Sequence, residues 1–176
     1  MKTFKQTTLL LLFMLMIGSA NAQTTTEDLT KDWERAKIYT KEYLDAMPEA
    51  SFSLKPTPEM RSFADQMLHL ADANYGFVTA ATGEKSPVAM AGLEKGTDKS
   101  KAAVTKETLA SYDFVIASIK KLTPVQLKEQ VKLFGRFDLP KGKVLEKAFE
   151  HQTHHRGQTT VYIRLAGATP PAEKLF

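Results

Sequence analysis

Residues 141–166 read KGKVLEKAFEHQTHHRGQTTVYIRLA, and Gly167 follows directly. Apolar and small side chains recur in this stretch at the three- and four-residue spacing of an amphipathic α-helix. Gly167 is typical of the position just past a helix end, and the prolines at 170 and 171 prevent any continuation. The stretch therefore predicts one long helix over residues 141–166, and this helix carries three of the four histidines of the chain.

Two of these histidines lie on the same face of the predicted helix. His151 and His155 are four residues apart, so they project from consecutive turns within about 40° of each other. Small and apolar residues share this face, which indicates that both imidazoles point inward: Val144, Ala148, Tyr162 and Ala166. Two inward imidazoles at this spacing can bind one metal ion, with nitrogen–zinc distances of about 2.0–2.1 Å. The alternative is that both rings only pack and hydrogen-bond inside the core.

The spacing of this pair invites comparison with the H-E-x-x-H motif of zinc proteases. Gln152 stands where that motif has its general-base glutamate, and a glutamine amide cannot take up a proton. Glu150 lies about 100° around the helix from His151 and is expected to be solvated. The sequence therefore argues against a protease of this type.

Three further helices are predicted from apolar periodicity, over residues 27–47, 58–81 and 101–122. Thr57, Pro58 and Glu59 form a cap, first-turn proline and acidic first turn, which predicts that the second helix begins at Pro58. Residues 83–99 are polar and predict a loop, with a short helical turn near residues 88–93. Residues 131–139 have the composition of an extended segment. Together these segments predict an all-α four-helix bundle, in which the long connections after the second and third helices allow an order other than up-down-up-down.

A metal site needs at least one more ligand from another helix, and His69 is the one histidine outside the fourth helix. His69 lies toward the edge of the apolar stripe of the second helix, so its helical phase alone leaves plain core packing open. Asp65 and Asp72 stand one turn on either side of it and are candidates for a general base, with solvation at the helix surface as the ordinary alternative. The chain has no cysteine, so any site is built from histidines and carboxylates.

The N-terminal residues have the pattern of a secretory signal. Lys2 and Lys5 precede an apolar run over residues 9–17, and Ser19-Ala20-Asn21-Ala22 offers the small-x-small pattern of a cleavage site. We expect cleavage after Ala22, which makes residues 23–176 a single exported domain in the periplasm or the extracellular space. The apolar run is shorter than the roughly 20 residues that cross a bilayer, and no transmembrane segment is expected in the mature chain.

The charge of the chain does not favour a nucleic-acid partner. The formal net charge is only +4, and two of the lysines belong to the predicted leader. The remaining basic residues are interspersed with acidic ones instead of forming a patch. We expect no nucleic-acid partner.

Several motifs together resemble the DinB-like family of four-helix metalloproteins. They are the FSLKP motif at 52–56, HLADANY at 69–75, HQTHHRGQ at 151–158 and GATPP at 167–171. The resemblance covers nearly all of residues 23–176. It implies a site for one divalent metal ion with His69, His151 and His155 as ligands, and with open positions for water or a substrate. Arg156, Gly157 and Gln158 match the same motif.

The residues that follow His151 and His155 in the helix also have predicted roles. Gln158 falls on the metal-facing side, where it can hydrogen-bond a bound water. Arg156 points away and is expected to form an ion pair with a neighbouring helix. Gly157, inside a helix, indicates close contact with another helix or a local need for space. Tyr162 is expected to pack in the core, with lining of the metal cavity as the alternative.

The metal triad leaves three readings of function open. The first is an enzyme acting on an unknown small-molecule substrate, either a metal-dependent hydrolase or a thiol-dependent transferase of the kind the family includes. The second is a non-catalytic metal-binding or stress-related protein, and the third is a bundle whose histidines merely pack. Imidazole ligands suit zinc, nickel and iron alike. A homodimer is also compatible with the resemblance.

Overall fold

The computed structural model describes residues 25–176, so the predicted signal segment lies outside the described residues. Four long helices dominate, with a two-stranded hairpin and two short 3₁₀ turns in the connections. In chain order the elements are α2 (Thr26–Ala46), η1 (Glu49–Ser51), α3 (Phe63–Thr82), α4 (Lys101–Lys120), η2 (Gln126–Lys128), β1 (Gln130–Leu133), β2 (Phe137–Pro140) and α5 (Lys141–Leu165). The predicted four-helix bundle is confirmed.

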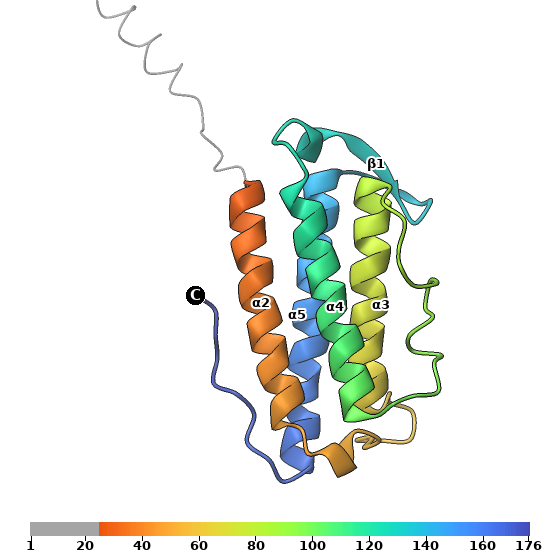
Figure 1. The fold of residues 1–176 in the computed structure, drawn as a ribbon, viewed down its shortest axis with the longest axis vertical. Coiled ribbons are helices and arrows are strands. Elements are labelled where there is room, and N and C mark those ends of the chain that lie inside the picture. The colour runs from red at the N-terminus through yellow and green to blue at the C-terminus, as the bar shows by residue number, and fades with distance from the viewer. Residues whose placement is uncertain (1–24) are drawn as a thin grey trace, which may run out of the picture.

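The helices do not alternate in direction along the chain (Figure 1). α2 and α5 run one way, whereas α3 and α4 both run the other way, because the long connection after α3 returns along the bundle before α4 begins. α3 packs mainly against α5 and α4, and α2 packs against α4 and α5. The pairing of α3 with α5 brings together the two helices that carry the four histidines.

The start of α3 corrects a prediction. The helix begins at Phe63 and not at Pro58, and its N-cap is Ser62, whose hydroxyl accepts a hydrogen bond from the backbone N–H of Asp65. The first backbone N–H groups of α3 are used by the preceding connector, since Phe63 donates to the carbonyl of Leu54. Thr57 instead closes a separate turn that ends at Met60. The cap-like sequence at 57–59 therefore forms a turn that precedes the helix.

A layer of buried side chains fixes α2, α4 and α5 to one another. Trp33 is fully buried, and the rings of Tyr112 and Phe149 both meet it edge-on with centroids 5.5 Å away. Next to them, the hydroxyl of Tyr112 hydrogen-bonds with Thr40 at 2.7 Å and donates to Oε1 of Gln152 at 2.9 Å. The hydroxyls of Thr40 and Tyr112 and the amide oxygen of Gln152 therefore satisfy one another inside the core, whereas the buried Nε1 of Trp33 has no hydrogen-bond partner within residues 25–176.

The β1–β2 hairpin confirms the extended segment expected near residues 131–139. Its strands are antiparallel, with Leu133 opposite Phe137, and they pack across α3 and α5. The turn places Phe134 at φ 49° and Gly135 at φ 71°. Glycine adopts such angles freely, but a bulky side chain in the left-handed region costs on the order of 1–3 kcal/mol.

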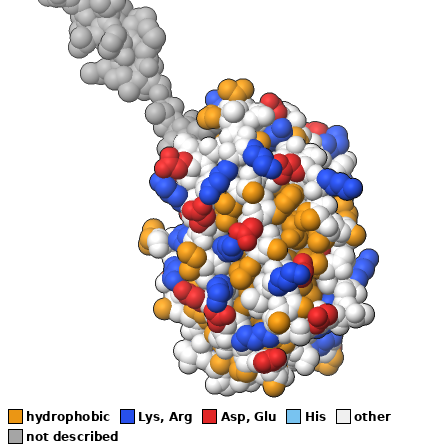
Figure 2. All heavy atoms as spheres, in the orientation of Figure 1, with side chains coloured by type: hydrophobic (Ala, Val, Ile, Leu, Met, Phe, Trp, Pro, Cys, Tyr) orange, Lys and Arg blue, Asp and Glu red, His pale blue; other side chains and the backbone are white. Residues whose placement is uncertain are grey.

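The face shown in Figure 2 carries basic and acidic side chains side by side, with apolar atoms scattered between them. Among the described residues, no helix has the length and apolarity needed to cross a membrane. The C-terminal segment returns along α2, where Arg35 donates a hydrogen bond to the backbone carbonyl of Lys174 at 3.0 Å.

Candidate metal centre

α3 and α5 bring His69, His151 and His155 together at their shared face. The ring centroid of His69 lies 5.4 Å from that of His151 and 4.6 Å from that of His155. The centroids of His151 and His155 are 4.3 Å apart. One ring nitrogen of each histidine lies within 4.8 Å of the corresponding atoms of the other two. All three side chains are partly buried. The structure therefore assembles the three histidines of the sequence prediction into one cluster that could hold a metal ion.

The spacing of these nitrogens fits a metal ion after small side-chain adjustments. Two nitrogens that each lie about 2.1 Å from the same ion are at most about 4.2 Å apart. The nitrogens of the cluster lie within 4.8 Å of one another, which is close to this value, so small side-chain rotations would bring them onto one ion. The donor set, three imidazoles and no thiolate, suits zinc, nickel or iron.

The ring of His69 is held by a carboxylate from the loop after α3. Its Nδ1 lies 3.2 Å from Oε2 of Glu94, whose other oxygen accepts a hydrogen bond from Nε of Arg61 at 2.7 Å. A carboxylate at one ring nitrogen fixes the tautomer and orientation of an imidazole and leaves the other nitrogen for a metal. Glu94 therefore directs Nε2 of His69 toward the cluster.

Asp72 holds the loop that carries Glu94. Its two carboxylate oxygens accept hydrogen bonds from the backbone N–H groups of Leu93 at 3.1 Å and Glu94 at 3.0 Å. Asp65, one turn before His69, is engaged with Ser62 and with the Lys99 ammonium at 3.0 Å. Both aspartates that were candidates for a general base therefore serve in local structure. Burial opposes ionisation of Asp65, but the hydrogen bonds from Ser62 and Lys99 lower its pKa.

His155 has a polar partner that the sequence analysis did not single out. The buried amide of Gln66 lies on α3, one turn before His69, and its nitrogen is 2.9 Å from Nδ1 of His155. The same amide donates to Oε1 of Gln158, and the Gln158 amide nitrogen lies 3.0 Å from Nε2 of His154. An amide nitrogen only donates, so Nδ1 of His155 is the acceptor in this contact and the neutral ring carries its proton on Nε2. Binding of a metal ion at Nε2 would require the Gln66 amide to turn so that its oxygen faces Nδ1, and Gln158 is bonded to Gln66 beside the cluster.

One ring nitrogen of His151 is available to bind a metal ion or a water. Its Nδ1 is buried and has no hydrogen-bond partner within residues 25–176. A buried ring nitrogen without a partner is costly, and a metal ion or an ordered water at this atom would satisfy it. The orphaned nitrogen and the donor set together fit a bound metal ion.

Electrostatics keep the two α5 imidazoles neutral. Burial, reinforced by the neighbouring histidines, lowers the pKa of His151 to about 4 and that of His155 to about 3. Both rings are therefore neutral at neutral pH, so each has one unprotonated nitrogen, which metal ligation requires.

The remaining residues of the motif have structural roles, and two expectations need correction. Arg156 is buried, with its guanidinium 4.4 Å from the ring centroid of Tyr39 and donating to Oε1 of Gln152 at 3.1 Å, so the expected ion pair is replaced by an aromatic and an amide contact. Gly157 is exposed, and a Cβ there would meet nothing within 4 Å, so it does not serve close helix packing.

Two other expectations for α5 hold. Tyr162 is buried in the core, where its hydroxyl donates to the carbonyl of Arg61 at 2.9 Å. Glu150 is exposed and paired with Lys147 at 2.6 Å. Neither side chain is in position to act as a base on the histidine cluster.

A cleft of about 570 Å³ opens beside His151. Its walls are mostly apolar and come from α3 and the hairpin: Phe77, Leu133, Phe134, Phe137 and Leu139. Phe77 lines the cleft beside His151, with its ring centroid 5.6 Å from that of His151 and 5.1 Å from that of Phe134. The cleft and the cluster therefore share a wall.

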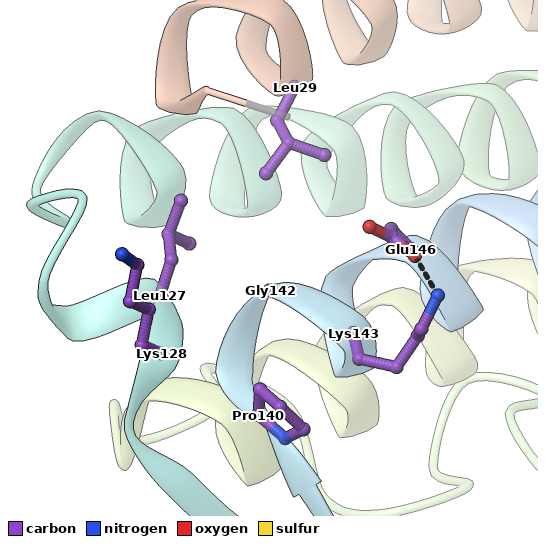
Figure 3. A pocket seen from close by; sticks show the side chains of 7 residues that line it. All are labelled: Leu29, Leu127, Lys128, Pro140, Gly142, Lys143 and Glu146. Atoms are coloured by element: carbon purple, nitrogen blue, oxygen red, sulfur yellow. Dashed lines mark hydrogen bonds and ion pairs between the residues drawn. The ribbon is translucent and has the colours of Figure 1, made fainter. Parts of the chain in front are cut away.

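Another hollow, of about 250 Å³, lies between the start of α2, η2 and the start of α5 (Figure 3). Leu29, Leu127 and Pro140 line it, and Lys143 and Glu146 pair with each other at its edge. None of its lining residues is a histidine, and it is separate from the histidine cluster.

Comparisons with known proteins agree with this architecture. Residues 20–175 match the model of the DinB family. The chain is 42% identical over 62 residues to the uncharacterized protein YrdA of Bacillus subtilis, a match that spans 35% of the chain and about a third (36%) of YrdA's length. It is 28% identical over 134 residues to YjoA of the same organism, covering 74% of the chain and 83% of YjoA.

Solved structures show the same fold. A DinB-like protein from Bacillus cereus superposes with a TM-score of 0.75 at 22% identity, covering 85% of this chain and 98% of the other. The crystal structure of YjoA superposes with a TM-score of 0.65 at 21% identity, covering 84% and 95%. The family match extends over nearly the whole of the described chain, and the chain belongs to the DinB family.

Proposed function

We propose that the protein binds one divalent metal ion through His69, His151 and His155 and uses it to activate a nucleophile against a small-molecule substrate. The observation that carries the proposal is the convergence of one ring nitrogen from each histidine within 4.8 Å. The carboxylate on His69, the amide on His155 and the orphaned Nδ1 of His151 support it. Glu94 and Gln66 hold the rings of His69 and His155 in place, and a bound metal ion would satisfy the orphaned nitrogen of His151.

A divalent ion held by His69, His151 and His155 would keep its full charge, because imidazole is a neutral ligand, and it would supply Lewis-acid chemistry to a water or thiol nucleophile. The protein residues contribute orientation. Glu94 keeps Nδ1 of His69 protonated, and Gln66 fixes the ring plane of His155. The nucleophile is water in a hydrolase and an added thiol in a transferase, because the chain has no cysteine of its own.

Two assays separate these reactions. Metal-loaded protein is incubated with p-nitrophenyl acetate for hydrolysis, and with a low-molecular-weight thiol plus 1-chloro-2,4-dinitrobenzene for thiol transfer. Metal-dependent turnover in either assay that is lost in His155→Ala assigns the reaction class. Metal binding without turnover in both assays would favour the alternative, a non-catalytic metal-binding protein.

We also propose that the protein is exported after removal of residues 1–22, a proposal that rests on the sequence pattern alone. Export bears on the reaction, because cytosolic thiols are less available outside the cell and hydrolysis is then the simpler chemistry. N-terminal sequencing of the secreted protein tests the proposal. A first residue of Gln23 is expected, and retention of Met1 would contradict it.

A further inference from the structure

The cleft beside His151 is walled by an aromatic side chain in an unfavourable backbone conformation. Phe134 sits at φ 49° in the hairpin turn, a region that glycine or asparagine occupies more easily. Its side chain is half exposed, so the residue is not retained there for burial. Such backbone strain, when it is observed, is concentrated at functional sites.

The neighbours of Phe134 are arranged to receive its ring. Phe77 contacts it from α3, and a Cβ on Gly76 would lie 3.8 Å from Cε1 of Phe134. The absence of a side chain at Gly76 leaves space along this part of α3. Phe137 stands on the other strand of the hairpin and is also half exposed. The hairpin therefore presents two partly exposed aromatic rings to an open cleft, instead of burying them in the core.

The cleft is joined to the metal centre through shared residues. His151 belongs to both, and Phe77 packs against His151 from the cleft side. The volume of about 570 Å³ lies within the range of about 300–1,000 Å³ that is typical of small-molecule sites. The polar lining is limited to the histidines and to Lys147 and Glu150, which pair with each other.

We propose that this cleft is the substrate pocket of the metal centre, and that it takes the aliphatic or aromatic portion of a small molecule whose polar group binds the metal ion. The proposal rests on the proposed function, because it assigns the polar end of the ligand to the three-histidine site. Beyond the proposed function, it states that the substrate has an apolar portion and that Phe134 and Phe137 contact this portion.

A series of alkyl hydroxamates tests the pocket, because the hydroxamate group binds divalent metals and only the tail changes. Acetohydroxamate, hexanohydroxamate and octanohydroxamate are titrated by calorimetry into zinc-loaded protein, and the zinc content is checked after each titration. A fully buried methylene strengthens binding about fourfold. Allowing for partial burial, we expect hexanohydroxamate to bind at least about tenfold more tightly than acetohydroxamate.

Phe134→Gly is the informative variant, because glycine tolerates the turn conformation and removes only the ring. We expect this variant to fold, to keep its affinity for acetohydroxamate and to lose most of the gain from longer tails. Phe176→Gly removes a fully exposed ring at the C-terminal end, outside the cleft, and should leave the series unchanged. Equal affinity for short and long tails in the wild-type protein, or an unchanged series in Phe134→Gly, would overturn the proposal.

Acetohydroxamate distinguishes failure of the metal site from failure of the substrate pocket. If acetohydroxamate binds only to zinc-loaded protein and the tail adds nothing, the metal site stands and the pocket proposal fails. If neither zinc nor acetohydroxamate binds, the proposed function fails and the pocket proposal fails with it. A tail dependence that is identical without zinc would contradict a single ligand spanning pocket and metal. Dissociation of a dimer by Phe134→Gly with no change in the hydroxamate series would make the cleft an interface and also overturn the proposal.

Discussion

Nδ1 of His69 on α3 faces Oε2 of Glu94, a residue 25 positions later in the loop after α3, at a distance of 3.2 Å. Arg61 binds the other carboxylate oxygen, and Asp72 fixes the backbone on which Glu94 stands. The loop after α3 thereby orients His69, the histidine that lies toward the edge of the apolar stripe of its helix. This relationship links the fold of the α3–α4 connection to the orientation of a proposed metal ligand.

Replacing Glu94 should weaken metal binding without unfolding the protein. Glu94→Ala removes the acceptor at Nδ1 of His69, and loss of such a partner lowers metal affinity about 10–100-fold. Glu94→Gln retains an oxygen that can accept this hydrogen bond and should lose less. Competition titration with a zinc indicator measures both. Glu150→Ala, which removes an exposed carboxylate, is the control, and an equal loss in that variant would contradict the assignment.

Asp72→Ala should reduce both stability and metal affinity. Two backbone N–H groups lose their acceptors, and the free energy of unfolding should fall by about 1–3 kcal/mol. Urea denaturation of the metal-free protein gives the first value, and zinc titration gives the second. Asp113→Ala removes an aspartate from an exposed ion pair with Lys37 and should cost less than about 1 kcal/mol. A similar loss of unfolding free energy in the two variants would contradict the role of Asp72 in holding the loop backbone.

Gln152 should prove structural even though it occupies the position of a catalytic glutamate in the zinc-protease motif. It is fully buried and accepts hydrogen bonds from Tyr112 and Arg156. Gln152→Ala leaves both donors without this acceptor, which should cost about 1–3 kcal/mol of unfolding free energy. Zinc affinity of the folded variant should remain within about threefold of the wild type, because Gln152 faces the core. A large loss of affinity at unchanged stability would place Gln152 in the site.

Acid should destabilise the metal-free protein through its buried histidines. The pKa values of His151 and His155 are lowered to about 4 and about 3 in the folded protein, whereas an unfolded histidine titrates near 6.5. Between these values the unfolded chain binds more protons, so stability is full above about pH 6.5 and declines as the pH falls toward 4 and 3. Urea midpoints at pH 7.5, 6.0 and 4.5 measure this decline. His155→Asn should show a shallower decline, and an identical pH profile would contradict the burial argument.

Much of the fold followed from periodicity, and the exceptions have physical reasons. α2, α4 and α5 begin and end within two residues of the predicted bounds, because each has a clear apolar stripe and distinct stop signals. α3 starts five residues later than predicted, because the connector at Phe52 and Leu54 takes up its first N–H groups. Such long-range backbone contacts leave no local pattern in the sequence.

The candidate site was predictable only in part. His151 and His155 followed from their spacing on one helix, whereas His69 depended on the family resemblance because nothing local identifies the facing helix. Glu94 and the aromatic turn residue Phe134 lie in connections, where no periodicity relates a residue to its spatial neighbours. Their contacts emerge only when α3, α5, the loop and the hairpin are placed together.

Metal stoichiometry tests the central claim most directly. The wild-type protein and the His69→Ala, His155→Ala and His154→Ala variants are dialysed against zinc, desalted and analysed for metal by inductively coupled plasma mass spectrometry. We expect one zinc ion per chain in the wild type and in His154→Ala, whose side chain is exposed outside the cluster, and loss of tight binding in His69→Ala and His155→Ala. A wild-type protein without stoichiometric metal, or one whose metal content is unaffected by His155→Ala, would contradict the three-histidine centre.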